Sequence, residues 1–416
     1  MNENYLVLDC ETESIEKGHP FHPDNFLCTV HWRSSTDVYG CFLIEYETLE
    51  PYGPKLDELQ EMIDAHDVLV LFNAKFDLHW LRRYGIRFQH KRIVDVQYLY
   101  FMLTYQQNKY PSLNDVCSYL GLETKQDVVY EEYWSKGILT SQIPPDVLIP
   151  YGNHDVFLTW ESAKKLLAKL ETRDAAFRNT FAVAMVDTLI LEEMEWHGLR
   201  YDTIAAAQVK EDTEAEIAEV DDLISEFTGG VPINTGSNDQ LSALIYGGKI
   251  YEKYYEQDGV YKSGARVGLP KMVPRVREHV MPGFVRPKQE WATSKEGVYS
   301  VGADTLEIIS QTRKGRAKKL VDLVLRKAGL MKRLSAYCNS IETLIHDKGW
   351  TSERGIATLH GNLNQCVAVT GRLSSASPNL QNIDGNIKFL FVSEFSKRNE
   401  YEQHEQQVSD SQIQGA

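Results

Sequence analysis

Residues 5–12 read Tyr-Leu-Val-Leu-Asp-Cys-Glu-Thr, an apolar run that ends in two acids one residue apart. Such a run is typical of a buried β-strand. Side chains at positions i and i+2 of a strand face the same way, so Asp9 and Glu11 are predicted to lie side by side. Two neighbouring carboxylates repel each other unless a cation lies between them, and oxygen ligands suit Mg²⁺ or Mn²⁺. Taken alone, the pair is also typical of a solvated sheet edge.

Two further stretches carry acids in comparable settings. Residues 68–72, Val-Leu-Val-Leu-Phe, predict a buried strand, and residues 73–81 follow it with helical apolar spacing. Asn73 is a plausible N-cap of that helix, with Asp77 one turn later. Residues 151–155, Tyr-Gly-Asn-His-Asp, open another helical stretch. Each stretch alone is compatible with a capped helix or a surface acid, but all three in this order indicate one shared acidic site.

Together these motifs make residues 1–170 resemble the 3′→5′ proofreading exonuclease domain of family A DNA polymerases, the bacterial polymerase I type. The resemblance implies that Asp9, Glu11, Asp77 and Asp155 bind two metal ions, Mg²⁺ or Mn²⁺, and are catalytic. Two such ions can clamp both oxygens of an in-line phosphodiester displacement. Tyr151 stands four residues before the last acid, as in the tyrosine branch of this exonuclease superfamily, and would be the catalytic residue that orients the attacking water.

The same resemblance implies contacts with the terminal nucleotide of the substrate. These contacts are expected from Asn73 and from the backbone near Thr12. His154 precedes the last acid in the sequence, but it would point elsewhere on a helix, and we expect it to lie outside the site.

A second motif near the other end of the chain resembles the primer-binding signature of the same polymerase family. Residues 370–375 read Thr-Gly-Arg-Leu-Ser-Ser, and residues 378–383 read Pro-Asn-Leu-Gln-Asn-Ile. Minor-groove acceptors occupy nearly equivalent positions in every base pair, so donors on a short turn can test base-pair geometry without reading sequence. The nucleic-acid-binding residues expected here are Arg372, Ser374, Asn379 and Gln381.

A basic run leads towards this motif. Residues 313–333 carry nine lysines and arginines against the single acid Asp322, in a chain whose net charge is −15. Phosphate contacts dominate affinity for nucleic acids, and the distribution of charge matters more than its total. We therefore expect the run, including Lys332 and Arg333, to follow a phosphate backbone, although a solvated helix face would look similar.

The predicted fold class is α/β: a ribonuclease H-like exonuclease domain with a mixed sheet, then a mostly helical thumb and an incomplete palm. A long helix is expected over 173–198, ending at Gly198, and residues 202–228 and 305–345 are expected to pair antiparallel. The predicted domains are the exonuclease at 1–170, connector and thumb at 171–345, partial palm at 346–396 and a polar tail at 397–416.

An insertion near residues 247–299 interrupts the thumb. It is rich in Gly, Tyr and basic residues, and four prolines break any helix. A loop this long is usually functional or disordered. We expect an extended thumb-tip segment that contacts DNA or a processivity factor, with disorder as the alternative.

Composition is compatible with an enzyme of the cytoplasm, or of the host cytoplasm if the gene is phage-derived. The sequence contains no recognisable signal peptide and no apolar run long enough to span a membrane. Its six cysteines lack Cys-x-x-Cys spacing, which argues against zinc sites and disulfides.

The last residues depart from the polymerase pattern. Residues 387–392 resemble the strand that leads to the polymerase catalytic motif, but Ser409 stands where the family has a metal-binding aspartate. We therefore interpret the chain as the front of a truncated or split polymerase, for which a phage is a natural source, and predict that it does not add nucleotides alone.

Three functions remain open. The first is a proofreading exonuclease that binds single-stranded and primer-template DNA. The second is a non-catalytic half that docks with a second polypeptide carrying the remaining palm and fingers, through an unpaired apolar edge at residues 389–392. The third is a freestanding RNA-processing exonuclease, which the primer-binding motif disfavours.

Overall fold

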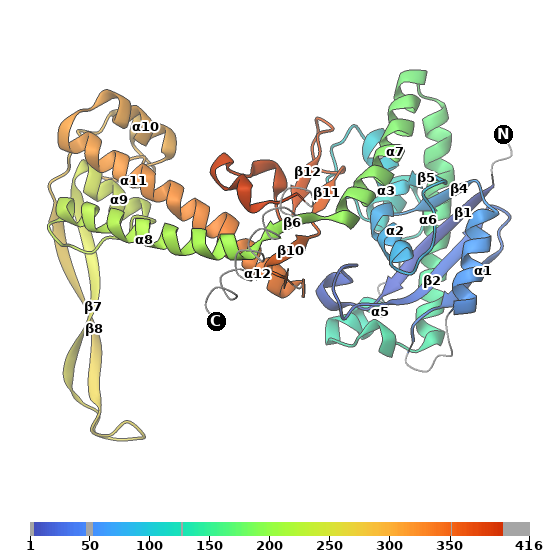
Figure 1. The fold of residues 1–416 in the computed structure, drawn as a ribbon, viewed down its shortest axis with the longest axis horizontal. Coiled ribbons are helices and arrows are strands. Elements are labelled where there is room, and N and C mark those ends of the chain that lie inside the picture. The colour runs from blue at the N-terminus through green and yellow to red at the C-terminus, as the bar shows by residue number, and fades with distance from the viewer. Residues whose placement is uncertain (1–3, 47–52, 126–127, 351, 394–416) are drawn as a thin grey trace, which may run out of the picture. The chain divides into compact units, whose positions relative to one another are not determined.

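A computed structural model describes residues 4–46, 53–125, 128–350 and 352–393 (Figure 1). The chain forms two compact units, one from Met1–Ile204 with Ile341–Ala416 and the other from Ala205–Ser340. Each unit is described by itself. The predictions for the polar tail, including Ser409, lie outside the described residues.

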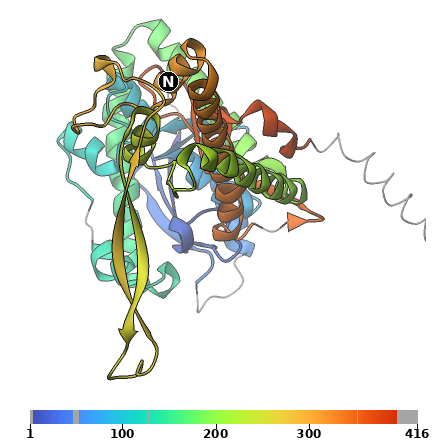
Figure 2. The same cartoon turned by 90° about the vertical axis from the view of Figure 1, so that its left-hand side faces the viewer.

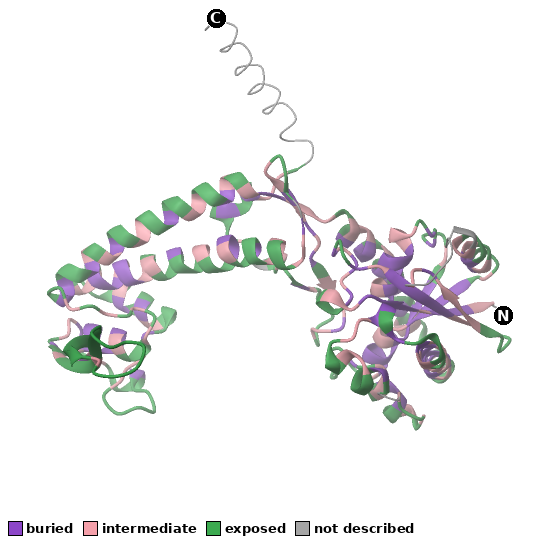
Figure 3. Ribbon diagram, turned by 90° about the horizontal axis from the view of Figure 1, so that it is seen from below, coloured by how far each residue is buried: buried purple, intermediate pink, exposed green. Residues whose placement is uncertain are grey.

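A mixed five-stranded sheet forms the centre of the first unit, as predicted. Its order is β3-β2-β1-β4-β5, in which β2 pairs antiparallel with β1 and β3, while β1, β4 and β5 run parallel. The strands are mostly buried (Figure 3). Their bounds are β1 Tyr5–Thr12, β2 Leu27–Ser34, β3 Tyr39–Leu43, β4 Val68–Leu71 and β5 Arg92–Asp95.

Alternation along β1 divides the core between the two faces of the sheet. Leu6 and Leu8 belong to one apolar cluster, with Leu78 and Trp80 of α2. Val7 belongs to the other cluster, with residues of α3, α6 and α7. The following positions of the Val7 face are Asp9 and Glu11, so the alternation that builds the core also presents these two acids together.

Helices cover both faces of this sheet (Figure 1). The predicted long helix is α7, and it ends before Gly198, whose φ of 64° is a left-handed value that favours glycine. The helices and 3₁₀ turns of this region are η1 Ile15–Lys17, α1 Gly53–Asp64, α2 Ala74–Arg83, α3 Val96–Leu103, α4 Leu113–Leu120, α5 Val128–Glu132, η2 Trp134–Lys136, η3 Thr140–Gln142, α6 Pro145–Glu171 and α7 Ala175–His197.

The last part of the chain returns to the first unit as small sheets. One has the order β6-β10-β9, and another pairs β11 with β12. The elements are β6 Leu199–Asp202, α12 Ser340–Asp347, β9 Ser352–Glu353, β10 Ile356–Leu359, β11 Asn362–Asn364, β12 Ser374–Ala376, η6 Leu380–Asn382 and η7 Gly385–Leu390.

The prediction of a strand at residues 387–392 is wrong. Gly385–Leu390 is a 3₁₀ turn begun by Asp384, whose side chain accepts a hydrogen bond from the Asn386 N–H. Phe391 then forms an antiparallel bridge with Tyr201, and the Val392 N–H donates to the Arg200 carbonyl over 3.0 Å. This edge is therefore paired within the chain, which removes the argument for docking through it.

Buried ion pairs join α2 to α7, and hydrogen bonds of the Leu363 backbone attach the returning segment to the same network. The Glu195 carboxylate is 5% exposed and accepts hydrogen bonds from Lys75 Nζ, His79 Nε2 and the Leu363 N–H. Removing one partner of such a buried network leaves an uncompensated charge. The residues around β11 are thus held against the helix that also carries Asp77.

The second unit is mostly helical. Helices α8 and α11 run side by side and antiparallel, as expected for 202–228 and part of 305–345 (Figure 1), and their contact contains Val220, Ile224, Leu320 and Val324. The unit contains α8 Thr203–Thr228, α9 Asn238–Tyr246, β7 Gly248–Val260, β8 Pro270–Met281, η4 Gln289–Trp291, α10 Ala303–Thr312, α11 Gly315–Arg333 and the π-helical turn η5 Leu334–Asn339. The insertion contains a regular β-hairpin, which the sequence analysis missed.

Within the described ranges, no helix combines the length and hydropathy that crossing a bilayer requires.

Gly152 allows α6 to approach the sheet closely, and its replacement tests this packing. A Cβ at Gly152 would overlap the ring of His31, a buried side chain bonded to Thr29 and Asn153. We expect Gly152→Ala to lower the free energy of unfolding by about 1–3 kcal/mol, because the ring has no room to move. Urea unfolding measures this change.

The matched control for this substitution is Gly385→Ala in the same unit, where an added Cβ meets no atom within 4 Å. This change should leave stability unaltered or raise it by about 0.5 kcal/mol. Equal unfolding midpoints for the two variants would contradict the close packing at Gly152.

Candidate metal-dependent nuclease site

Three carboxylates converge at the end of the central strand. Asp9 and Glu11 of β1 and Asp155 of α6 each offer an oxygen, and these oxygens lie within 4.8 Å of one another. In the part of the chain that the structure describes, no other group of three or more His, Cys, Asp or Glu side chains gathers so closely. The strand and the helix that sequence reasoning singled out therefore meet at this point.

Local irregularity at the end of β1 accompanies the cluster. The pairing of β1 with β2 shifts register between Glu11 and Thr12. Bulges of this kind re-aim side chains and are frequent next to functional sites. The next residue, Glu13, is buried and accepts hydrogen bonds from the Thr140 N–H over 2.9 Å and the Ser141 hydroxyl over 2.7 Å, which fixes the strand end.

Asp77 lies behind the three acids rather than among them. Its side chain is 2% exposed, and its Oδ1 accepts a hydrogen bond of 2.9 Å from the N–H of Cys10, the residue between Asp9 and Glu11. The structure thus brings Asp77 to the same strand end but outside the group of three oxygens.

Burial raises the pKa of these acids. Burial raises the pKa of Asp155 to about 7 against the opposing charge of Lys125. It also raises the pKa of Asp9, and, together with the charge of Asp9, the pKa of both Glu11 and Asp77. Crowded, desolvated carboxylates of this kind need a cation to remain ionised.

The oxygens present fit a divalent cation. Asp155 Oδ1 is buried and has no hydrogen-bond partner among the described residues. An unbonded buried carboxylate oxygen is costly unless a donor or a metal satisfies it. Three carboxylates also match the all-oxygen ligand sets that Mg²⁺ and Mn²⁺ prefer.

Lys125 supplies a positive charge at this cluster, and sequence reasoning missed it. Its Nζ forms an ion pair with Asp155 and lies 4.2 Å from the centre of the Tyr151 ring. Burial alone would lower the pKa of Lys125, but the charges of Asp155 and Glu11 raise it well above its usual range. Lys125 lies in an irregular segment outside any helix or strand, so no periodicity pointed to it.

Tyr151 is one turn before Asp155 in α6 and is half-buried. Burial and the nearby charge of Glu11 raise the pKa of its phenol well above the usual value. Tyr151 therefore stays a neutral hydroxyl that can donate one hydrogen bond and accept others. His154 faces elsewhere and contacts Glu123 over 3.1 Å.

Asn73 occupies the N-cap position of α2, but its side chain does not cap the helix. The residue is left-handed, with a φ of 60°, and makes no side-chain capping bond. Asp95 takes that role by accepting hydrogen bonds from the N–H groups of Asn73 and Ala74. The Asn73 side chain thus remains exposed at the start of the helix that carries Asp77, while Thr12 is buried at the end of β1.

The predicted primer-binding residues form one turn around β12. Asn379 accepts from the Gln381 N–H, and Gln381 Nε2 donates to the Leu373 carbonyl over 2.9 Å. These two side chains therefore hold the turn. Arg372 is exposed and makes no ion pair within the described ranges, so it is the cation this turn offers, with Ser374 half-buried beside it.

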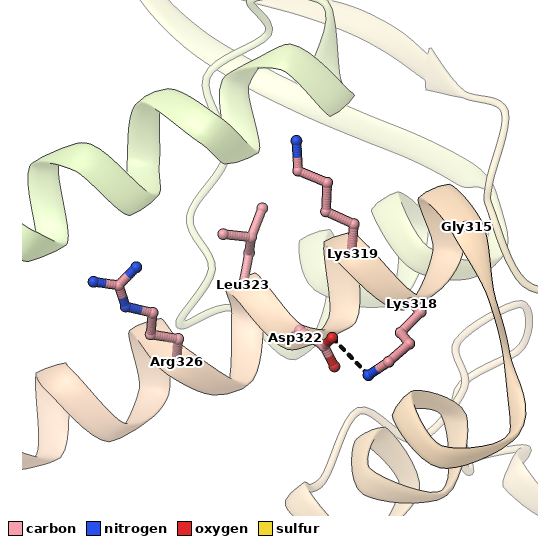
Figure 4. A pocket seen from close by; sticks show the side chains of 6 residues that line it. All are labelled: Gly315, Lys318, Lys319, Asp322, Leu323 and Arg326. Atoms are coloured by element: carbon pink, nitrogen blue, oxygen red, sulfur yellow. Dashed lines mark hydrogen bonds and ion pairs between the residues drawn. The ribbon is translucent and has the colours of Figure 1, made fainter.

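Much of the basic run is neutralised inside the second unit. Lys318 pairs with Asp322 over 2.7 Å on one side of a shallow pocket of α11 (Figure 4). Arg326 pairs with Glu216 of α8 over 3.0 Å, and Lys327 pairs with Asp221 over 2.5 Å. The expected phosphate-binding residues Lys332 and Arg333 lie at the end of α11, exposed and half-buried respectively.

The mixed sheet and its acidic cluster agree with the ribonuclease H-like exonuclease fold expected from the sequence, and sequence comparison identifies the family. The model of the 3′-5′ exonuclease family matches residues 1–171, and that of DNA polymerase family A matches residues 277–407. The chain belongs to DNA polymerase family A and carries its 3′-5′ exonuclease domain.

Individual relatives agree with this assignment. DNA polymerase I of Chloroflexus aurantiacus is 25% identical over 75% of this chain and 28% of its own length. DNA polymerase I of Bacillus subtilis is 26% identical over 61% of this chain and 23% of its own length. The chain thus spans about a quarter of these curated relatives.

A solved structure shares the fold. The POL domain of Pol1 from M. smegmatis, in complex with DNA primer-template and dNTP, superposes with a TM-score of 0.59 at 16% identity. The match covers 92% of this chain and 53% of that one.

Replacement of Lys125 tests its part in the cluster. We expect Lys125→Met to lower the free energy of unfolding in EDTA by about 3 kcal/mol, because it leaves buried Asp155 without a counter-charge. Affinity for Mn²⁺ should rise, since the ammonium no longer competes for Asp155. Thermal unfolding and calorimetric Mn²⁺ titration measure the two effects.

The control for charge alone is Lys136→Met, which removes an exposed lysine of η2 that pairs with Glu132, four residues earlier in the chain. It should change neither stability nor Mn²⁺ affinity appreciably. Unchanged stability of Lys125→Met in EDTA would show that Lys125 does not hold the carboxylates together.

Proposed function

We propose that this chain is a divalent-metal-dependent 3′→5′ exonuclease that removes nucleotides from DNA 3′ ends during replication. The observation that carries the proposal is the convergence of Asp9, Glu11 and Asp155, with the unbonded Oδ1 of Asp155. Their buried carboxylates form a preorganised cation site, and the match to the exonuclease family supports phosphodiester hydrolysis as its chemistry.

Each side chain has a distinct task in this proposal. Asp9, Glu11 and Asp155 would hold one Mg²⁺ or Mn²⁺ ion, and Asp77 would help Asp9 to hold a second. When bound, such ions neutralise charge on the phosphate and lower the pKa of water. The neutral phenol of Tyr151 accepts or donates a hydrogen bond to the attacking water and thereby orients it. Asn73 and the backbone at Thr12 position the terminal nucleotide.

DNA contact outside the site rests on separate residues. We assign primer-template binding to Arg372 and Ser374 on the turn that Asn379 and Gln381 hold, and phosphate contact to Lys332 and Arg333. The exposed guanidinium of Arg372 supports the first assignment, because Arg is a versatile donor to base edges and phosphates. The cytoplasm, with its replicating DNA, is the corresponding location.

Replacement of Asp9 tests the nuclease assignment. The substrate is a 5′-labelled primer-template in Mg²⁺, with and without all four nucleotides. Wild type should give a shortening ladder that EDTA abolishes, and Asp9→Ala should give none, since it removes a carboxylate shared by the cation sites. Asp24→Ala, which removes an exposed acid of the same unit, should leave the ladder intact.

The outcomes separate the remaining hypotheses. Metal-dependent shortening by Asp9→Ala at the wild-type rate would contradict the site. Shortening of RNA in preference to DNA would favour the RNA-processing alternative. A wild-type chain that shortens nothing would leave a non-catalytic half as the better account, and primer lengthening would contradict our prediction about nucleotide addition.

Replacement of Arg372 separates duplex binding from hydrolysis. Arg372→Ala should weaken binding to primer-template DNA by about tenfold, the loss of one good contact, while hydrolysis of a short single strand stays unchanged. Fluorescence anisotropy and the labelled-strand assay measure the two quantities. Arg354→Ala, an exposed arginine of the same unit, is the control; equal losses of binding and hydrolysis in Arg372→Ala would mean that the two sites are not separate.

A further inference from the structure

The hairpin of the second unit is a two-stranded ribbon that projects from the helices of that unit (Figure 2). Strands β7 and β8 pair antiparallel from Lys249 opposite Val280 to Gln257 opposite Met272. A ribbon of two strands with no third element packed on it is only marginally stable in water. The distribution of side chains between its two faces therefore shows which charged and apolar groups are paired or packed within the ribbon and which remain exposed.

On one face, charged side chains of the ribbon form ion pairs with each other. Directly opposed residues share a face, which places Glu252 with Arg277 and Tyr254 with Arg275 on this side. Arg275 bonds to Glu256 over 3.2 Å, and the guanidinium of Arg277 lies 4.7 Å from the centre of the Tyr254 ring.

The opposite face, here called the tyrosine face, combines aromatic and aliphatic side chains with one ion pair, between Lys249 and Glu278. Its residues are Lys249, Tyr251, Lys253, Tyr255 and Gln257 of β7 and Met272, Pro274, Val276, Glu278 and Val280 of β8. Tyr255 is 69% exposed and Val276 is 61% exposed, so neither packs against the rest of the unit. Tyr251 and Tyr255 flank Lys253, for which no ion pair occurs among the described residues.

The charge of the ribbon is opposite to that of the whole chain. Residues 248–281 contain seven lysines and arginines against four acids, a net charge of +3 in a chain of −15. Three of those acids are in ion pairs with residues of the same ribbon. The cations that have no ion pair in the described structure are Lys253, Lys262, Arg266 and Lys271.

We propose that the tyrosine face binds single-stranded DNA, an inference that rests on the proposed function because that function supplies DNA as the substrate. Tyr251 and Tyr255 stand four residues apart on one strand, a separation of roughly 13 Å, which lets two bases of an extended strand stack at separate points. Aromatic stacking accepts any base, and cations along the path contact the backbone phosphates. Lys253 lies between the two rings, where it would meet a phosphate.

The position of Lys253 favours nucleic acid over an apolar protein surface. A protein that packed closely on both tyrosines would desolvate the ammonium between them, which is costly without a paired charge. A DNA strand provides that charge at each nucleotide. The other cations without an ion pair in the described structure, Lys262, Arg266 and Lys271, lie at or next to the hairpin tip.

The test uses the full chain with Asp9→Ala, so that the probe is not degraded, and a 5′-labelled deoxythymidine oligonucleotide. Fluorescence anisotropy should show that Tyr251→Ala with Tyr255→Ala weakens binding by about 30-fold or more, the loss of two stacked bases. Tyr254→Ala removes a tyrosine from the same strand but the opposite face, and it should bind as the parent does. Lys253→Ala should reduce the slope of log affinity against log salt by about 0.7, one phosphate contact.

Equal affinities for the double variant and Tyr254→Ala would overturn the proposal and favour a protein partner for this face. The proposed nuclease activity is tested separately. It fails if the chain with Asp9 intact gives no shortening ladder that Asp9→Ala abolishes. Intact 3′-end shortening with unaffected binding of the double variant would remove only the hairpin proposal. Tyrosine-dependent binding without any shortening would remove only the nuclease proposal.

Discussion

The burial of like-charged carboxylates at the end of β1 is the constraint on which the first unit depends. Between the ordinary Asp value of 3.8 and the raised pKa of about 7 for Asp155, the folded state binds more protons than the unfolded state, so its stability falls as pH rises through that window. At neutral pH the ionised cluster therefore opposes folding. Lys125 offsets part of that cost with one charge, and a divalent cation would offset more. Cation binding thus explains why rigid elements converge on groups that repel each other.

Other buried acids of the same unit show that burial alone does not make a site. Glu195 receives three donors, and although burial acts to raise its pKa, His79 and Lys75 lower it below the usual value. Asp95 accepts four backbone N–H groups and fastens two helices. These acids are satisfied by the chain itself. Asp155, unlike Glu195 and Asp95, keeps a buried oxygen without a donor, and it does so beside two further carboxylates, which together support a ligand role.

The sequence predicted what local periodicity encodes. The two-residue repeat of β1 placed Asp9 and Glu11 together, and the apolar patterns of the other elements predicted the mixed sheet around them. Lys125 could not be predicted, because its partner Asp155 is thirty residues away and the segment that carries it has no repeat. The capping role of Asp95 could not be predicted either, because Asn73, which occupies the N-cap position of α2, is itself a residue type that favours capping. The hairpin was missed because its prolines and glycines resemble those of an irregular loop.

The same contrast between paired and unpaired side chains distinguishes the helices of the second unit from its hairpin. The α8–α11 pair buries its apolar faces and neutralises Arg326 and Lys327 against α8, which leaves the proposed phosphate contact to Lys332 and Arg333 at the end of α11. In the hairpin, both faces contain ion pairs, but the tyrosine face also leaves Tyr251 and Tyr255 exposed on either side of a lysine that has no ion pair in the described structure. Exposed aromatic rings gain free energy only by contact with something else. A ribbon that exposes them beside unpaired cations is therefore better explained by a ligand with flat apolar rings and negative charges than by its own stability.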